Sequence, residues 1–134
     1  MAKTFDYPNG AFTLSLPDDW DYAVKNASIA FFQPETGFGA INVSALAPTK
    51  GARDPAKIAL QFTPGTLRAG LQVTNFECSV PAANVEYEID GNAWRLWTFC
   101  GRTRVVVVTY NCRVHSKGKE DRTVDQIVQS LIVS

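Results

Sequence analysis

The chain has 134 residues, with 13 basic and 13 acidic side chains, and therefore carries no formal net charge at pH 7. This length fits one domain with a sizeable core, so residues 1–134 are expected to form a single domain. The charge balance argues against a surface for nucleic acid or anionic membranes, and no stretch approaches the length needed for insertion into a bilayer.

The cysteines bear on the compartment of the protein. Cys78, Cys100 and Cys112 are odd in number and lack the spacing of a metal site. Free thiols fit a reducing compartment. The N-terminal residues lack the apolar core of a signal peptide, although a mature domain without its leader would look the same. We therefore expect a cytoplasmic protein.

The first third of the chain predicts short strands separated by turns. Apolar and polar residues alternate over residues 12–16, which is the pattern of a half-buried strand, and Pro17 ends it. Further strands are expected at residues 4–7, 22–24, 29–32 and 40–46.

Two helices are predicted in the rest of the chain, with a strand over residues 71–80 between them. Asp54 and Pro55 form a favoured pair of N-cap and first helical residue, which predicts a helix over residues 54–62. The clearest helix is expected over residues 120–131, where acidic residues begin the segment and apolar residues recur at helical spacing. The apolar residues are Val124, Ile127, Val128 and Leu131.

Residues 85–114 predict three consecutive antiparallel strands. Asp90-Gly91 is typical of a two-residue hairpin turn, and a second reversal falls at residues 101–104. With these turns, Tyr87 faces Trp94. In the next pair of strands, Arg95 faces Tyr110.

Both faces of this three-stranded segment are largely apolar. The two-residue period puts Trp94 on one face and Trp97 on the other. An antiparallel sheet with one solvated face would alternate more cleanly, so other elements must cover part of each face. We expect an α+β fold in which an antiparallel sheet of six to seven strands packs with two main helices. The apolar residues of the C-terminal helix are expected to cover the Trp94 face, with Leu131 in the same cluster as Trp94.

The opposite face then supplies the candidate partner-binding residues. A C-terminal helix on the Trp94 side would leave the Trp97 face incompletely covered, and an uncovered apolar patch on a soluble domain usually marks a partner site. Aromatic residues and arginine dominate binding energy at interfaces. The expected partner-binding residues are Trp97, Phe99, Tyr110, Arg95 and Glu86. The alternative is that the 54–62 helix and the N-terminal strands cover this face, which would then be ordinary core.

No catalytic, cofactor-binding or metal-binding residues are predicted. His115 follows Cys112 by three residues, and a Cys–His pair defines one alternative function, a small thiol-dependent hydrolase centred on Cys112. Residues three apart on a strand point to opposite faces, which argues against that pair and against a metal site. A pocket for a small apolar ligand inside the curved sheet is a further alternative.

Three local stretches, in this order along the chain, carry a resemblance to a known family. They are residues 11–20 (Ala-Phe-Thr-Leu-Ser-Leu-Pro-Asp-Asp-Trp), the Asp90-Gly91 hairpin followed by Trp94 and Trp97, and the closing Val-Gln-Ser-Leu-Ile-Val of residues 128–133. Together with the order of elements, they resemble the PsbP-like fold family over nearly the whole chain. That family includes photosystem II subunit P, a nuclear release factor that binds the Ran GTPase, and bacterial chaperones for type VI secretion effectors.

The resemblance implies a PsbP-like fold and a non-catalytic protein that binds another protein. A bacterial accessory factor, an immunity-type protein and a secretion-effector chaperone all fit that description. The matching stretches form the fold rather than a site, so the resemblance carries over no binding residue. The identity of the partner stays open, as does the formation of a homodimer.

Overall fold

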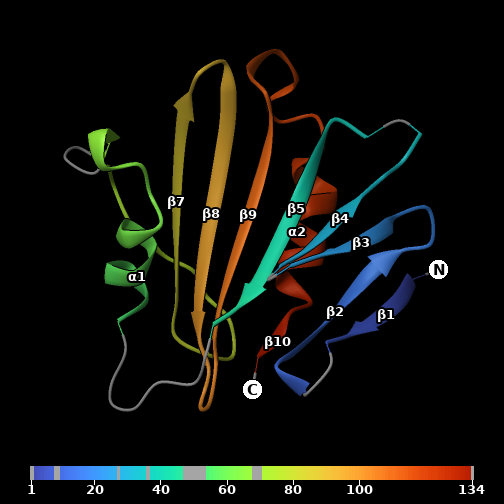
Figure 1. The fold of residues 1–134 in the computed structure, drawn as a ribbon, viewed down its shortest axis with the longest axis horizontal. Helices are drawn as coiled ribbons and strands as arrows, with labels where there is room; N and C mark the ends of the chain where they lie inside the picture. The colour runs from blue at the N-terminus through green and yellow to red at the C-terminus, as the bar shows by residue number, and fades with distance from the viewer. Residues whose placement is uncertain are drawn as a thin grey trace.

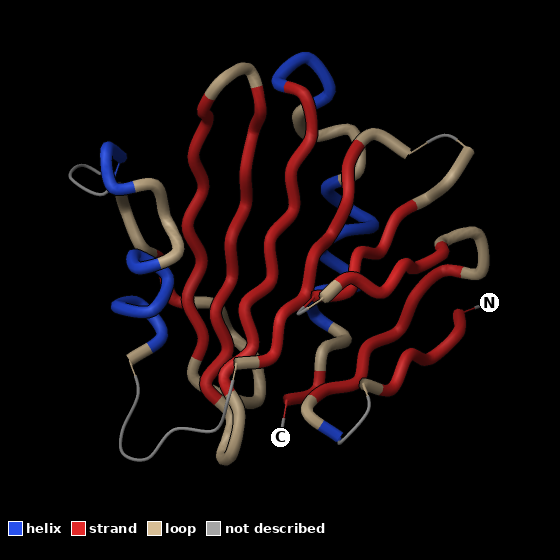
Figure 2. Tube along the Cα trace, in the orientation of Figure 1, coloured by secondary structure: helices blue, strands red, loops and turns tan. Residues whose placement is uncertain are grey.

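A computed structural model of the protein describes residues 2–7, 10–26, 28–35, 37–46, 54–67 and 71–133. In these residues, two antiparallel sheets pack with two α-helices (Figures 1 and 2). The small sheet has the strand order β1-β2-β10, and the large sheet has the order β3-β4-β5-β9-β8-β7-β6. The expected α+β fold with an antiparallel sheet is therefore confirmed.

The strands have the following bounds. Those of the small sheet are β1 (Ala2–Asp6), β2 (Phe12–Pro17) and β10 (Ile132–Val133). Those of the large sheet are β3 (Asp21–Lys25), β4 (Ser28–Phe32), β5 (Gly39–Ala45), β6 (Thr74–Asn75), β7 (Ala82–Ile89), β8 (Asn92–Cys100) and β9 (Val105–Arg113).

The α-helices are α1 (Pro55–Gln61) and α2 (Asp121–Gln129). Two 3₁₀ turns are η2 (Gly65–Leu67) and η3 (Val114–Ser116). Among the described residues, no helix combines the length and apolarity that crossing a membrane requires.

The strands β7, β8 and β9 form the predicted meander. Asp90 and Gly91 have φ angles of 53° and 79°, as a two-residue hairpin turn of mirror-image type requires. Tyr87 pairs with Trp94, and Arg95 pairs with Tyr110, so the predicted register is confirmed across both hairpins.

The helices cover opposite faces of the large sheet. Figure 1 shows α1 beside β7 and α2 running behind β5. The apolar side of α2, together with β2, buries the face that carries Trp97, Phe99 and Tyr110. On the other face, a smaller cluster joins Ala59 of α1 to Val85, Leu96 and Val107.

The expectation that the C-terminal helix covers the Trp94 face is wrong. Leu131 is buried, but in the cluster of Trp97, and Trp94 lies partly exposed on the opposite face, where its ring stacks on Tyr87 with centroids 6.0 Å apart. The start of α2 is fixed by Glu120, whose carboxylate accepts hydrogen bonds from the Tyr110 hydroxyl and the Gly39 amide. Those two donors hold α2 over the Tyr110 side.

The first helix confirms its prediction within a residue at each end. The Asp54 carboxylate accepts a hydrogen bond of 2.9 Å from the Ala56 amide and caps α1. The buried hydroxyl of Thr98 donates to the Pro55 carbonyl over 2.6 Å, which ties the first turn of α1 to β8.

Two predicted elements differ from the structure. Of residues 71–80, only Thr74–Asn75 forms a strand, which pairs with Asn84 and Ala83 of β7, and one further bond joins the Phe76 amide to the Ala82 carbonyl. The C-terminal helix ends at Gln129, two residues before the predicted boundary. The Ser130 hydroxyl donates to the Ile127 carbonyl and accepts from the Ser15 amide, and the chain then continues as β10 along β2.

Candidate functional site

Three of the five predicted partner-binding residues lie in the core. Trp97 and Phe99 are each 1% exposed and Tyr110 is 2% exposed. Their expected exposure is wrong, because α2 and the small sheet cover this face of the large sheet. Glu86 is exposed and Arg95 is partly buried, so these two lie at the margin of the covered area.

A groove of about 350 Å³ opens at this margin, and we call it the β7–β9 groove. It contains three of the predicted residues, Glu86, Arg95 and Tyr110. The other residues that line it are Tyr87, Glu88, Ala93, Trp94, Cys112, Lys117, Gly118 and Asp121.

The floor of the groove follows from strand register. Ala93 of β8 lies directly opposite Cys112 of β9, so two small side chains face each other across the sheet. By the alternation of the strands, the side chains of Glu86, Glu88 and Arg95 share this face with them. A hollow therefore forms where small residues lie between larger ones, and the segment after η3 supplies its wall.

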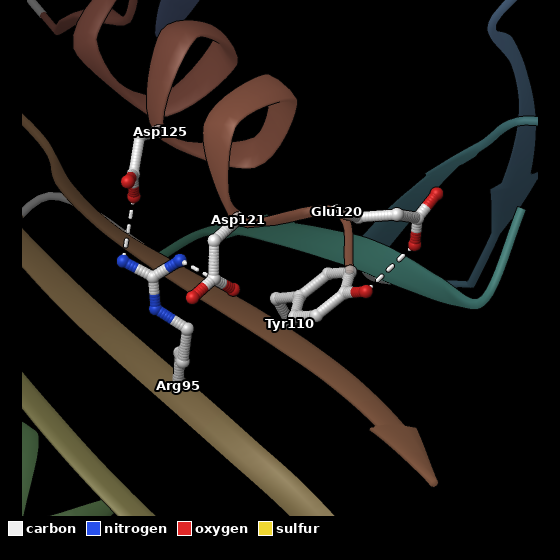
Figure 3. Close-up of polar contacts among 5 residues, drawn as sticks. All are labelled: Arg95, Tyr110, Glu120, Asp121 and Asp125. Atoms are coloured by element: carbon white, nitrogen blue, oxygen red, sulfur yellow. Dashed lines mark hydrogen bonds and ion pairs between the residues drawn. The ribbon is translucent and has the colours of Figure 1, made fainter. Parts of the chain in front are cut away.

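Arg95 links the sheet to α2 at one side of the groove (Figure 3). Its guanidinium donates to Asp125 over 2.6 Å and to Asp121 over 3.4 Å. The guanidinium carbon also lies 4.7 Å from the centroid of the Trp97 ring, within the range of a cation–π contact. Arg95 is thus committed to α2 and does not offer a free cation to a partner.

Tyr110 makes the second link to α2 (Figure 3). Its hydroxyl donates to the Glu120 carboxylate over 2.6 Å, and the same oxygen accepts from the Gly39 amide over 2.9 Å. Burial and the bond to Glu120 raise the pKa of Tyr110 well above its usual value, so the phenol keeps its proton and remains a donor. A side chain at position 39 would overlap the Asn111 carbonyl and the Tyr110 ring, so only glycine fits there.

The mouth of the groove carries a more exposed ion pair. The Lys117 ammonium lies 3.0 Å from the Glu88 carboxylate, and this bond raises the pKa of Lys117. Glu86 makes no hydrogen bond or ion pair to any residue that the structure describes. The lining therefore holds the carboxylates of Glu86, Glu88 and Asp121 against the two cations of Arg95 and Lys117.

The structure does not bring together a Cys–His pair. Cys112 is buried on the face covered by α2, and His115 is exposed in η3. Cys78, Cys100 and Cys112 are free thiols. Across the described ranges, no group of three or more His, Cys, Asp or Glu residues is placed to hold a metal ion.

The prediction missed the α2 side of the site. Asp121 and Asp125 are four residues apart on one helix, a spacing that puts both carboxylates on the same face and could have indicated a shared basic partner. The contribution of Lys117 has no such signal, because it depends on the path of the turn between β9 and α2.

No known family profile matches the chain, and no curated protein matches it in sequence. Solved structures do match. The cyanobacterial PsbP protein CyanoP from Synechocystis superposes with a TM-score of 0.73 at 10% identity, over 99% of this chain and 92% of its own. The Ran-binding protein Mog1p from Saccharomyces cerevisiae gives a TM-score of 0.61 at 12% identity, over 99% of this chain and 95% of its own.

A protein from Bacteroides thetaiotaomicron matches with a TM-score of 0.69 at 18% identity over 98% of this chain. That match covers 48% of the Bacteroides protein, so this chain spans about half its length. At such identities the likeness concerns the fold. The chain has the PsbP-like fold, as the resemblance in its sequence implied.

Proposed function

We propose that this protein is a non-catalytic module that binds another protein, and that the partner docks in the β7–β9 groove. The observation that carries the proposal is the hollow over Ala93 and Cys112, which is rimmed by carboxylates, and among these Glu86 forms no hydrogen bond or ion pair with the described residues. Mog1p, a Ran-binding protein with the same fold, supports a protein as the ligand.

The chemistry of the groove favours a lysine or arginine side chain of the partner. The aliphatic stem of such a residue would lie on Ala93 and Cys112, with its cation beside Glu86 and Glu88. Bonds between a cation and a carboxylate are stronger than neutral hydrogen bonds, although each such pair at exposed side chains like these contributes only about 0.2–1 kcal/mol. The partner's cation competes with Lys117 for Glu88 and also meets Glu86, whose attraction to Lys117 is electrostatic and involves no direct hydrogen bond.

Within this role, we propose an accessory factor in a bacterial cytoplasm, such as an immunity-type protein or a chaperone of a type VI secretion effector. The resemblance in sequence and the free state of the cysteines support this proposal. The neighbouring genes test it. Secretion-cluster genes beside this one in several genomes would support the chaperone role, and a neighbourhood without secretion genes would contradict it.

The experiment is affinity capture from the source cells with a matched set of variants. The wild-type protein and Lys57→Glu, an exposed change on α1, are expected to capture the same partner. Glu86→Arg reverses the charge in the groove at an exposed position and is expected to lower the captured amount at least about tenfold, which corresponds to roughly 1.4 kcal/mol.

Two outcomes would contradict the proposal at different levels. A partner that Glu86→Arg captures as well as the wild type does would move the docking site away from the groove. The absence of any partner that depends on the folded wild-type protein would contradict the protein-binding role itself.

A further inference from the structure

The strand β3 is a free edge of the large sheet. It pairs with β4, begins the strand order, and has all five residues exposed. Val24 is 72% exposed and Tyr22 is 47% exposed. A free edge presents unpaired amide and carbonyl groups to other strands, and natural proteins usually protect it with proline, a bulge or inward-pointing charges. The strand β3 contains no proline, and its register with β4 is continuous. Its protection is limited to its short length, the charges of Asp21 and Lys25, and a bond of 2.8 Å from the Tyr22 amide to the Asp21 carboxylate, which a pairing strand would have to displace.

The sequence of β3 is complementary to itself in the antiparallel direction. It reads Asp-Tyr-Ala-Val-Lys from Asp21 to Lys25. When two copies pair about Ala23, Asp21 of each copy faces Lys25 of the other. Tyr22 then faces Val24 of the other copy. Opposite charges and aromatic–β-branched pairs both stabilise antiparallel neighbours, and the twofold symmetry makes each pair occur twice.

An apolar groove adjoins this edge. It has a volume of about 300 Å³, and Phe5 and Tyr7 of the N-terminal segment line it together with Tyr22 and Val24. The rings of Phe5 and Tyr22 meet edge to face, with centroids 5.0 Å apart. A second copy paired along β3 therefore covers apolar side chains at the edge as well as backbone groups.

We propose that the protein forms a symmetric dimer by antiparallel pairing of β3 with β3 of a second copy, which joins the two large sheets into one. The contact is short. Five residues from each copy fall well below the roughly 20–30 residues per side of a standard interface, so the dimer is a weak one that forms at high concentration. The β7–β9 groove lies toward the opposite edge of the sheet, so each copy in the dimer keeps its groove accessible.

The test is a charge exchange across the symmetry axis, followed by sedimentation velocity up to roughly 1 mM protein, where weak contacts associate. The wild type is expected to dimerise as its concentration rises. Asp21→Lys sets two cations against each other at both ends of the contact, and Lys25→Asp sets two anions against each other. Each single variant is expected to weaken the dimer at least about tenfold.

An equimolar mixture of the two single variants restores opposite charges at both ends and is expected to form a heterodimer. The double variant Asp21→Lys/Lys25→Asp is expected to form a homodimer as the wild type does. The exposed changes Lys57→Asp and Glu77→Lys lie away from β3 and serve as matched controls that leave the dimer unchanged. Amide chemical shifts of residues 21–25 should also move with the concentration of the wild type.

Three results would overturn the proposal. One is a wild type that stays monomeric over the whole concentration range. The second is a dimer that neither single variant weakens, which would mean that the copies meet through another surface. The third is a pair of weakened variants that the mixture fails to rescue, which would exclude the register about Ala23.

Discussion

The two faces of the large sheet carry similar apolar alternation but are covered very differently. The face of Trp97 and Tyr110 lies in one large cluster with α2 and the small sheet. On the opposite face, a smaller cluster packs Leu96, Val85 and Val107 of the sheet against Ala59 of the short helix α1. The apolar pattern of a strand therefore shows that a face is covered, and the partner elements decide how deeply it is buried.

Adjacent valines test this difference most directly. Val106 lies on the face covered by α2 and Val107 on the face covered by α1, and both are buried. Val106→Ala is expected to lower the free energy of unfolding by about 2–3 kcal/mol, and Val107→Ala by about 1–2 kcal/mol, because α1 can settle into the space left behind. Urea unfolding of the two variants measures both values, and an equal or larger loss for Val107→Ala would remove the distinction between the faces.

The hydrogen bonds that tie α2 and α1 to the large sheet provide a second test of the difference between the two faces. Tyr110→Phe removes the bond to Glu120 at the start of α2 and is expected to cost about 1–2 kcal/mol at neutral pH. The raised pKa of Tyr110 adds a pH dependence. Above pH 10, the ordinary value, the unfolded chain loses this proton before the folded chain does, so the stability falls as the pH rises.

The variant Tyr110→Phe lacks that alkaline loss of stability, so its melting temperature should decline less steeply than that of the wild type between roughly pH 9 and pH 11. Identical slopes for Tyr110→Phe and the wild type would show that the bond to Glu120 does not set this behaviour.

The corresponding link of α1 is expected to have the smallest effect. Thr98→Val keeps the shape of the side chain and removes the bond to the Pro55 carbonyl, which should cost about 0.5–1 kcal/mol. Hydrogen exchange should increase in α1 and remain unchanged in α2. Exchange that increases equally in both helices would mean that the two faces do not respond independently.

The register of the central strands could be predicted because its determinants are local. Asp90-Gly91 fixes the first hairpin, and every pairing partner then follows by counting along the chain. The same counting put Glu86, Glu88 and Arg95 on one face, which is the strand side of the β7–β9 groove. The small sheet lacked such a signal, because the two residues of β10 are too few to show a period.

The side on which α2 packs could not be predicted from the alternation. That choice depends on the meeting of Glu120 with Gly39, which lies 81 residues away in the sequence, and with Tyr110 on a different strand. The apolar pattern of a single strand or helix carries no information about contacts with distant segments of the chain. The predicted aromatic patch was wrong for the same reason, although Glu86, Arg95 and Tyr110 do meet in the groove.

The small sheet has a consequence for the order of events during synthesis. Its central strand β2 needs β10, and Ser15 and Ser130, which join the two segments, are 115 residues apart. At about 5–20 residues per second, the ribosome takes roughly 6–23 s to supply the missing strand. During that time the inward side of β2, with Phe12, Leu14 and Leu16, also lacks the apolar residues of α2 that cover it, so this part of the core can close only after α2 and β10 have left the ribosomal tunnel.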